Sequence, residues 1–156
     1  MAARPNRTTR WLFRLPAYLY HWHCGWLLGH RFMLLMHTGR RTGRRHETVL
    51  EVMEYRAAAH EAVVMSAFGR ADWLRNIEAR PGEVAIGRER FAAAHRILAP
   101  EEAVGVVGGY ERRNRLMAPV VRLGLSWLAG WRYRSTDADR RRLAAQFPFV
   151  AFRPAR

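Results

Sequence analysis

Hydrophobic positions alternate with polar ones, or run unbroken over short stretches, at several places after residue 30. Alternation with a period of two is typical of a β-strand with one buried face, and a short apolar run bounded by turn residues is typical of a fully buried strand. This pattern predicts six strands, over residues 31–37, 46–55, 61–68, 83–87, 90–98 and 147–154. The first two follow each other too closely for a crossover connection, so we expect an antiparallel pair.

Other segments show the period and the end signals of helices. Thr8 or Thr9 begins a segment that is helical to about Leu28, and Asp72 begins a short helix that ends before Pro81. The further helices are expected over residues 100–114, 115–133 and 135–146, the second of them apolar and interrupted by Pro119 and Gly124. Six strands with near-neighbour pairing predict a mostly β fold with flanking helices (α+β), in which an antiparallel sheet closes into a small barrel.

No linker or repeat divides the chain, so we expect a single domain over residues 1–156. Two segments stand apart from the barrel pattern. One is an apolar and basic N-terminal helix over residues 8–29, and the other is an apolar helical insertion over residues 115–133.

The charge of the chain indicates anionic partners but does not identify which class of anion is bound. The net charge is +14, and all 27 basic residues are arginine, which codon usage in a GC-rich genome explains better than function does. Arginine forms a permanently charged fork suited to phosphate and carboxylate. Nucleic acid, an anionic membrane surface and a phosphorylated cofactor are therefore all open as partners.

The N-terminal segment has two interpretations. Its tryptophans and arginines suit a helix at the inner face of the plasma membrane, but packing on the body of the domain is the more typical arrangement of such a segment. The lone Cys24 excludes an intramolecular disulfide and favours a cytoplasmic protein. His21, His23 and Cys24 lack a second ligand cluster elsewhere, so no metal site is expected.

The basic stretch HTGRRTGRRHETVLEV, residues 37–52, contains the first candidate site. Gly39 and Gly43 bracket a turn between two expected strands, where backbone N–H groups can converge on an anion. Its other members are Arg40, Arg41, Thr42 and Arg44. The alternative is an ordinary β-turn with solvated arginines.

The second candidate is SAFGRADW, residues 66–73, where a strand meets the start of a helix. Such a junction exposes backbone N–H groups to a ligand. Ser66 and Arg70 supply polar groups there, and Phe68 and Trp73 supply aromatic surface. The alternative is a plain connection with Trp73 in the core.

Signatures of several enzyme classes are absent from the sequence. There is no G-x-S-x-G nucleophile motif and no G-x-G-x-x-G motif after an expected strand. Paired carboxylates suited to acid–base work are scarce, because Glu101 and Glu102 belong to a helix start. If the protein is an enzyme, we expect a cofactor to supply its chemistry.

Taken together, these segments resemble the deazaflavin-dependent nitroreductase family of actinobacterial proteins, which use coenzyme F420. The resemblance rests on HTGRRTGRRHETVLEV, SAFGRADWLRNIEARP, GRERFAAAHRILAPEEA, GYERRN and FPFVAFRP, in this order, and covers residues 31–153. It implies a split β-barrel. It also implies hydride transfer from the reduced deazaflavin to a small apolar acceptor such as a quinone, an enone or a nitro compound.

The resemblance assigns cofactor contacts to individual residues. It places the coenzyme phosphate on the basic turn and the deazaflavin ring against the segment after the third strand, and Trp73 with Asn76 matches a W-x-x-N pattern at the following helix. The residues expected to bind the cofactor are Arg40, Arg41, Thr42, Gly43, Arg44, His46, Thr48, Ser66, Ala67, Phe68, Gly69, Arg70, Trp73 and Asn76.

Three positions depart from the family pattern. His46 stands where many relatives have arginine, Val49 replaces a proline and Ala67 replaces a glycine. No catalytic residue is identified, and Tyr110 and Tyr133 are candidate proton donors by residue type alone.

Two other functions remain open. The first is a non-catalytic binder of F420, of FMN or of a related ligand. The second is a nucleic-acid-binding protein, which only the net charge favours. The sequence leaves the acceptor and the choice between monomer and homodimer undecided.

Overall fold

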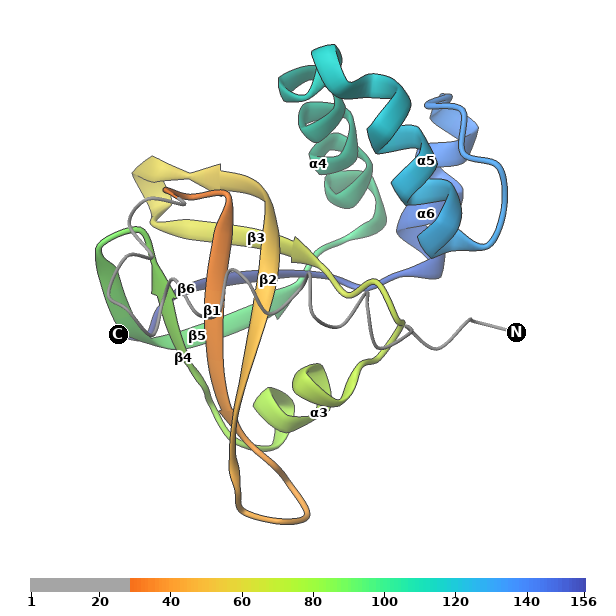
Figure 1. Ribbon diagram of the computed structural model, residues 1–156. Helices are drawn as coiled ribbons and strands as arrows, with labels where there is room; N and C mark the ends of the chain where they lie inside the picture. The colour runs from red at the N-terminus through yellow and green to blue at the C-terminus, as the bar shows by residue number, and fades with distance from the viewer. Residues whose placement is uncertain (1–28) are drawn as a thin grey trace.

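The computed structural model describes residues 29–156, so the helix expected before Gly29 lies outside the described part of the chain. The strands of this part are β1 (Phe32–Thr38), β2 (Arg45–Arg56), β3 (Glu61–Met65), β4 (Glu83–Ile86), β5 (Glu89–Ile97) and β6 (Phe149–Pro154). The α-helices are α3 (Asp72–Ala79), α4 (Pro100–Arg113), α5 (Ala118–Ala129) and α6 (Asp137–Gln146). Figure 1 shows α4, α5 and α6 packed together beside the strands, with α3 lying apart from them near the β1–β2 turn.

The six strands form a closed barrel in the order β1-β2-β3-β6-β5-β4, and every pairing is antiparallel. Two long strands each take part in both halves of the barrel. β2 pairs with β1 through residues 45–51 and with β3 through residues 52–56. β5 pairs with β4 through residues 89–92 and with β6 through residues 93–97. This confirms the predicted split β-barrel.

Three of the differences from the predicted element boundaries have a clear local cause. The third strand ends at Met65 rather than at residue 68, because Ser66–Gly69 forms a hydrogen-bonded turn. The connection after β2 is a short 3₁₀ turn, η2 (Ala57–Ala59), closed by His60 in the left-handed conformation. The helix predicted from residue 135 begins at Asp137, after the side chain of Thr136 accepts a hydrogen bond from the backbone N–H of Asp139.

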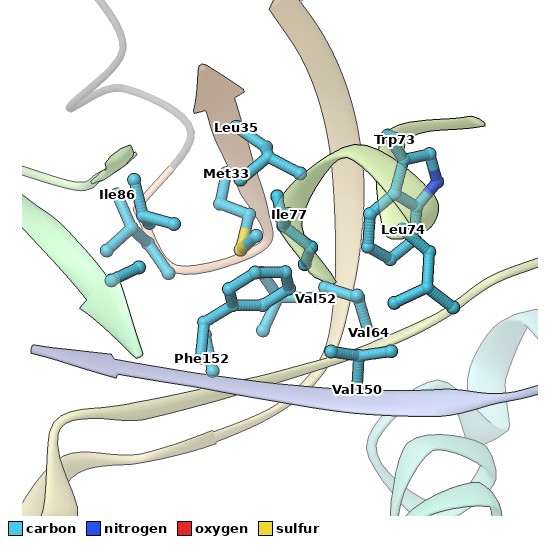
Figure 2. Close-up of a cluster of buried hydrophobic side chains, with 13 residues drawn as sticks. Met33, Leu35, Val52, Val64, Trp73, Leu74, Ile77, Ile86, Val150 and Phe152 are labelled. Carbon is cyan, nitrogen blue, oxygen red and sulfur yellow. The ribbon is translucent and has the colours of Figure 1, made fainter. Parts of the chain in front are cut away.

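The barrel interior forms the first of two hydrophobic cores. Met33, Val64 and Phe152 point into it from β1, β3 and β6, and Leu74 and Ile77 reach it from α3 (Figure 2). These five side chains are at most 2% exposed. Since α3 buries the apolar side chains of one face in this core, its position against the barrel is fixed.

The second core joins the barrel to the three helices beside it. Val63 and Phe149 supply its strand side, while Val107, Leu125 and Leu143 come from α4, α5 and α6. The predicted apolar insertion thus consists of a 3₁₀ turn, η3 (Arg115–Met117), followed by α5. Only part of α5 is buried in this core, because the remainder of the helix faces a cavity and solvent.

Four charged side chains tie α4 to the barrel. The Nη1 atom of Arg56 lies 2.8 Å from Glu61 and 2.7 Å from Glu102, and the Nη2 atom of Arg96 lies 2.9 Å and 2.8 Å from the same two carboxylates. Burial opposes ionisation of Glu61, yet bonds from Arg96 and Arg56 lower the pKa of this carboxyl. Hydrogen bonds from Arg96 and Arg56 lower the pKa of Glu102 to about 2.

Because the pKa of Glu102 is depressed in the folded protein, its ion pairs stabilise the fold above pH 4.5 and this contribution is lost as the pH falls towards 2. Glu102→Gln should therefore lower the free energy of unfolding by about 1 kcal/mol at pH 7, a value discounted for partial exposure. Urea denaturation at pH 7 and at pH 3 should show the difference from wild type narrowing at the lower pH.

Glu101→Gln is the matched control, because Glu101 is the exposed neighbour of Glu102 on the same helical turn. Its unfolding free energy should follow that of the wild type at both pH values. A constant difference between Glu102→Gln and wild type over this pH range would contradict the assigned role of Glu102.

Candidate functional site

Two neighbouring hollows lie along β2. The first is a polar hollow of about 470 Å³ that includes the basic turn, and the second is an apolar cavity of about 500 Å³ between β2 and α5. Thr48 and Trp73 belong to the walls of both. A ligand with a charged end and an apolar end could therefore occupy the two hollows together.

The basic turn is tightly folded. The backbone N–H of Gly39 donates to the carbonyl of Arg44, and that of Gly43 donates to the carbonyl of Gly39, each at 2.8 Å. A Cβ atom on Gly39 would lie 2.6 Å from the Thr42 hydroxyl, and Gly43 has a φ of +66°, which L side chains rarely adopt. Both glycines are therefore required by the shape of the turn.

Arg40 does not project freely into solvent. Its Nη1 atom donates to Asn76 Oδ1 at 3.0 Å and to Asp72 Oδ1 at 3.1 Å, and its backbone N–H donates to the same Asn76 oxygen at 3.1 Å. These bonds fasten the turn to α3 and hold the guanidinium at the wall of the polar hollow. Arg41 lines the same hollow and is exposed.

A buried histidine continues this network beneath the hollow. Asn76 Nδ2 lies 3.1 Å from His37 Nδ1, and His37 Nε2 lies 3.1 Å from the Thr48 hydroxyl. An amide nitrogen only donates, so Nδ1 accepts and the ring proton is on Nε2, which donates to Thr48. Burial and then the nearby His46 ring lower the pKa of His37, which favours this neutral form. The chain Arg40–Asn76–His37–Thr48 thus runs from the basic turn to the junction of the hollows.

The apolar cavity has a barrel side and a helix side. Met53 and Met65 come from β2 and β3, and Val121, Gly124 and Leu128 come from α5. A cavity of this size, mostly apolar with a few polar groups at its edge, is typical of small-molecule sites.

The connection Ser66–Ala71 forms another wall of the cavity. Ala67, Phe68 and Ala71 line it, and Phe68 is 55% exposed although aromatic. The Ser66 hydroxyl is turned inward and donates to the carbonyl of Gly69 at 2.5 Å, so this serine supports the loop from beneath.

Polar side chains close the end of the cavity farthest from the basic turn. The Tyr110 hydroxyl donates to Glu51 at 2.6 Å, and Arg31 donates to Asn114 Oδ1 at 2.8 Å. Burial, and then the hydrogen bond to Glu51, raise the pKa of Tyr110. All four side chains also line a third hollow, of about 340 Å³, beside the cavity.

Tyr133 lies outside these hollows. It is 2% exposed in the second core, and its hydroxyl donates to Glu111, which also pairs with Arg140. This position does not support the expectation that Tyr133 protonates a bound ligand. Tyr110 is the candidate that reaches the cavity.

The structure brings together many of the residues that the sequence pointed to. The polar hollow contains Arg40, Arg41, Thr42, His46, Thr48, Trp73 and Asn76, and the cavity contains Thr48, Ala67, Phe68 and Trp73. Gly43 and Arg44 shape the turn without lining either hollow. Gly69 and Arg70 line a different hollow next to α6, and Arg70 also pairs with Glu78 of α3.

Sequence reasoning missed His37, Asp72 and the helical wall of the cavity as site residues. Nothing in the sequence marked His37 as a site residue, because the pattern predicts it only as the last residue of a buried strand. The apolar period of residues 115–133 indicated a helix, but not which of its faces would border a cavity.

No protein-family model matches the chain, and no curated protein matches its sequence. Among solved structures, an F420-H2 dependent reductase (FDR-A) is similar with a TM-score of 0.50 and 15% identity, over 80% of this chain and 96% of that chain. A domain-swapped dimer is similar with a TM-score of 0.51 and 14% identity, over 93% of this chain and 98% of that one. The chain therefore has the split-barrel fold of an F420-dependent reductase, as the sequence resemblance implied.

Removing the Asn76 side chain should destabilise the protein through the network beneath the polar hollow. Asn76→Ala leaves His37 Nδ1 and the backbone N–H of Arg40 without their partners, and Asn76 is only 4% exposed. We expect a loss of about 2–3 kcal/mol in unfolding free energy, measured by urea denaturation.

Arg75→Ala is the matched control on the same helix, since Arg75 is exposed. Its effect should stay within about 0.5 kcal/mol. If Asn76→Ala were equally mild, Asn76 would not be the fastening between α3 and the basic turn.

Proposed function

We propose that this protein is an F420H2-dependent oxidoreductase that reduces a small apolar acceptor, of the quinone, enone or nitro class. One observation carries the proposal: an arginine-bearing hollow and an apolar cavity meet at Thr48 and Trp73. The fold shared with an F420-H2 dependent reductase supports it.

The donor set suits the coenzyme at both ends. Coenzyme F420 joins a flat deazaflavin to a phosphodiester and a polyglutamate tail, and when bound in reduced form it supplies a hydride. The anionic part matches Arg40, Arg41 and the hydroxyl of Thr42 in the polar hollow. The flat ring matches the apolar wall formed by Ala67, Phe68 and Trp73. Ala67 stands where the family pattern has glycine, and its side chain lines the cavity without filling it. We therefore expect the ring to fit beside Ala67.

The chain's own residues contribute orientation and exclusion of water. Asn76 and Asp72 hold the Arg40 guanidinium, so this charge is positioned before any ligand binds. Trp73 is 8% exposed and is anchored in the barrel core, which makes the junction between the hollows rigid. The helix α5 covers the cavity from outside and shields a bound acceptor from solvent.

A non-catalytic binder of F420, or of FMN, is the second candidate. It is favoured by Tyr110, which is a poor proton donor to a ligand. Its hydroxyl donates its proton to Glu51, and its pKa is raised. In the reductase proposal, solvent or Tyr110 itself completes the proton balance of the acceptor. Tight binding of the coenzyme with no turnover of any acceptor would favour the binder.

Arg41→Gln should weaken binding of F420 by roughly tenfold or more, because a charge-assisted bond to an anion contributes about 1.5–3 kcal/mol. Arg40→Gln combined with Arg41→Gln should weaken it further. Dissociation constants are measured by titrating the purified protein with oxidised and reduced coenzyme, and FMN is titrated in parallel to identify the preferred ring.

The double change Arg75→Gln and Arg80→Gln is the matched control. It removes the same charge from exposed positions that line neither hollow. Unaltered coenzyme affinity after loss of both Arg40 and Arg41 would place the anion elsewhere and refute the assignment of the polar hollow.

Gly124→Leu should block the cavity without unfolding the protein. A Cβ at Gly124 meets open space, and leucine is the better helix former by up to about 1 kcal/mol, so stability should be kept or raised. Reduction of a nitro compound or a quinone by F420H2 should fall at least roughly tenfold, since a mispositioned acceptor loses its aligned geometry.

Gly105→Leu is the control for this change. Gly105 lies on an exposed face of α4, also has open space at its Cβ position, and does not line the cavity. Equal turnover in a correctly folded Gly124→Leu variant and in Gly105→Leu would rule out the cavity as the place where the acceptor reacts.

A further inference from the structure

The segment η3–α5 exposes an unusual amount of apolar surface. Leu116, Val120, Leu123 and Trp127, here called the α5 stripe, are 94%, 58%, 73% and 50% exposed. Elsewhere in residues 29–156, the large apolar side chains with comparable exposure are Phe68, at the cavity wall, and Ile97. Apolar surface gathered on one element marks an interaction site more often than scattered single residues do.

The stripe follows helical spacing. Val120, Leu123 and Trp127 lie at intervals of three and four residues, which places them on one face of α5, and Leu116 precedes them in η3. The opposite face is buried through Leu125 and Ala129 in the second core. Between the two faces, Val121 and Gly124 border the apolar cavity. The four side chains of the stripe therefore take no part in the packing of the hydrophobic cores.

The charged residues in the sequence on either side of the stripe are of one sign. Residues 112–134 contain no aspartate or glutamate. Their six arginines are Arg112, Arg113, Arg115, Arg122, Arg132 and Arg134. An apolar face whose flanking sequence carries only arginines among its charged residues, with a tryptophan at its end, matches the pattern of a helix that lies in the interface of an anionic bilayer.

We propose that the α5 stripe docks on an anionic lipid surface, with its four apolar side chains at the headgroup–acyl boundary and the flanking arginines on lipid phosphates. Charge complementarity selects this occupant. A second copy of the stripe would bring six further arginines against the first six. Residues 1–28 are a poor partner for the stripe because of the same repulsion between arginines. They carry Arg4, Arg7, Arg10 and Arg14 and no acidic residue.

No helix within residues 29–156 has the length and apolar character needed to cross a membrane.

This docking would place the cavity mouth near the lipid. Met117 and Val120 line the cavity and are exposed beside Leu116, so the cavity wall and the stripe form one continuous apolar surface. An apolar molecule dissolved in the bilayer would reach the cavity along α5 without crossing water. The docking itself does not depend on which ligand the cavity holds.

Flotation of the full chain with lipid vesicles tests the proposal. We expect the protein to float with phosphatidylcholine vesicles that contain phosphatidylglycerol, and to float far less with phosphatidylcholine alone or at high salt. Leu123→Glu should reduce the vesicle-bound fraction by about tenfold or more, because it places a carboxylate among the lipids. Ile97→Glu, the same kind of change on exposed β5, should float like the wild type.

The arginines are tested in the same assay. Arg115→Gln with Arg122→Gln should weaken binding to the phosphatidylglycerol vesicles, while Arg75→Gln with Arg80→Gln should have a smaller effect. All these variants should keep the wild-type affinity for F420, because none of the substituted side chains lines a hollow around the proposed coenzyme site. Failure of docking is thereby separated from failure of the proposed function.

Three results would overturn the proposal. The first is no association of the wild type with anionic vesicles. The second is association that Leu123→Glu leaves unchanged, which would assign membrane binding to another surface such as residues 1–28. The third is a dimer in solution, by sedimentation, that Leu123→Glu dissociates while vesicle binding is absent, which would assign the stripe to a second copy.

Discussion

The arrangement of the site depends on β2 being shared by both halves of the barrel. Its first part is bonded to β1 and its last part to β3, so the strand cannot slide or detach without opening both pairings. The basic turn precedes it, the apolar cavity lies along its middle, and the third hollow lies along its end. Position along this one strand therefore corresponds to position along the site, from the polar hollow at the basic turn, through the apolar cavity, to the third hollow.

The hydrogen bonds of Asn76 give the basic turn a fixed place against that strand. A turn with this many arginines could have been a mobile, solvated loop. Here Arg40 is bound to α3, α3 is anchored through Leu74 and Ile77 in the barrel core, and His37 continues the connection to Thr48. The same side chains thus serve the packing of a helix and the placement of a charge, so that rigidity at the site comes from the core of the barrel.

The strands and their antiparallel pairing could be predicted from the sequence, because alternation is a local property of the chain and the connections are short. So could the basic turn, where Gly39 and Gly43 mark its ends. The pairing of β3 with β6 and of β1 with β4 joins strands that are not neighbours in the chain and was not predicted. The burial of His37 and the removal of Tyr133 from the site could not be predicted either, since each depends on partners distant in sequence. These partners are Asn76 for His37, and the Glu111 that binds Tyr133 together with Arg140. Local patterns report which residues are apolar or polar, but not which of two cores or hollows a side chain enters.

The two hollows are made from different stretches of the chain. Residues 37–76 form the polar hollow entirely, whereas the outer wall of the apolar cavity comes from residues 110–128. The helical insertion packs on the barrel through the second core, and the neighbouring α4 is held by the ion pairs of Arg56 and Arg96 with Glu61 and Glu102. The cavity-facing positions of α5 can therefore vary while the barrel stays closed. Substitution in α5 alone can thus reshape the apolar cavity, while the basic turn keeps its shape and its bonds to α3.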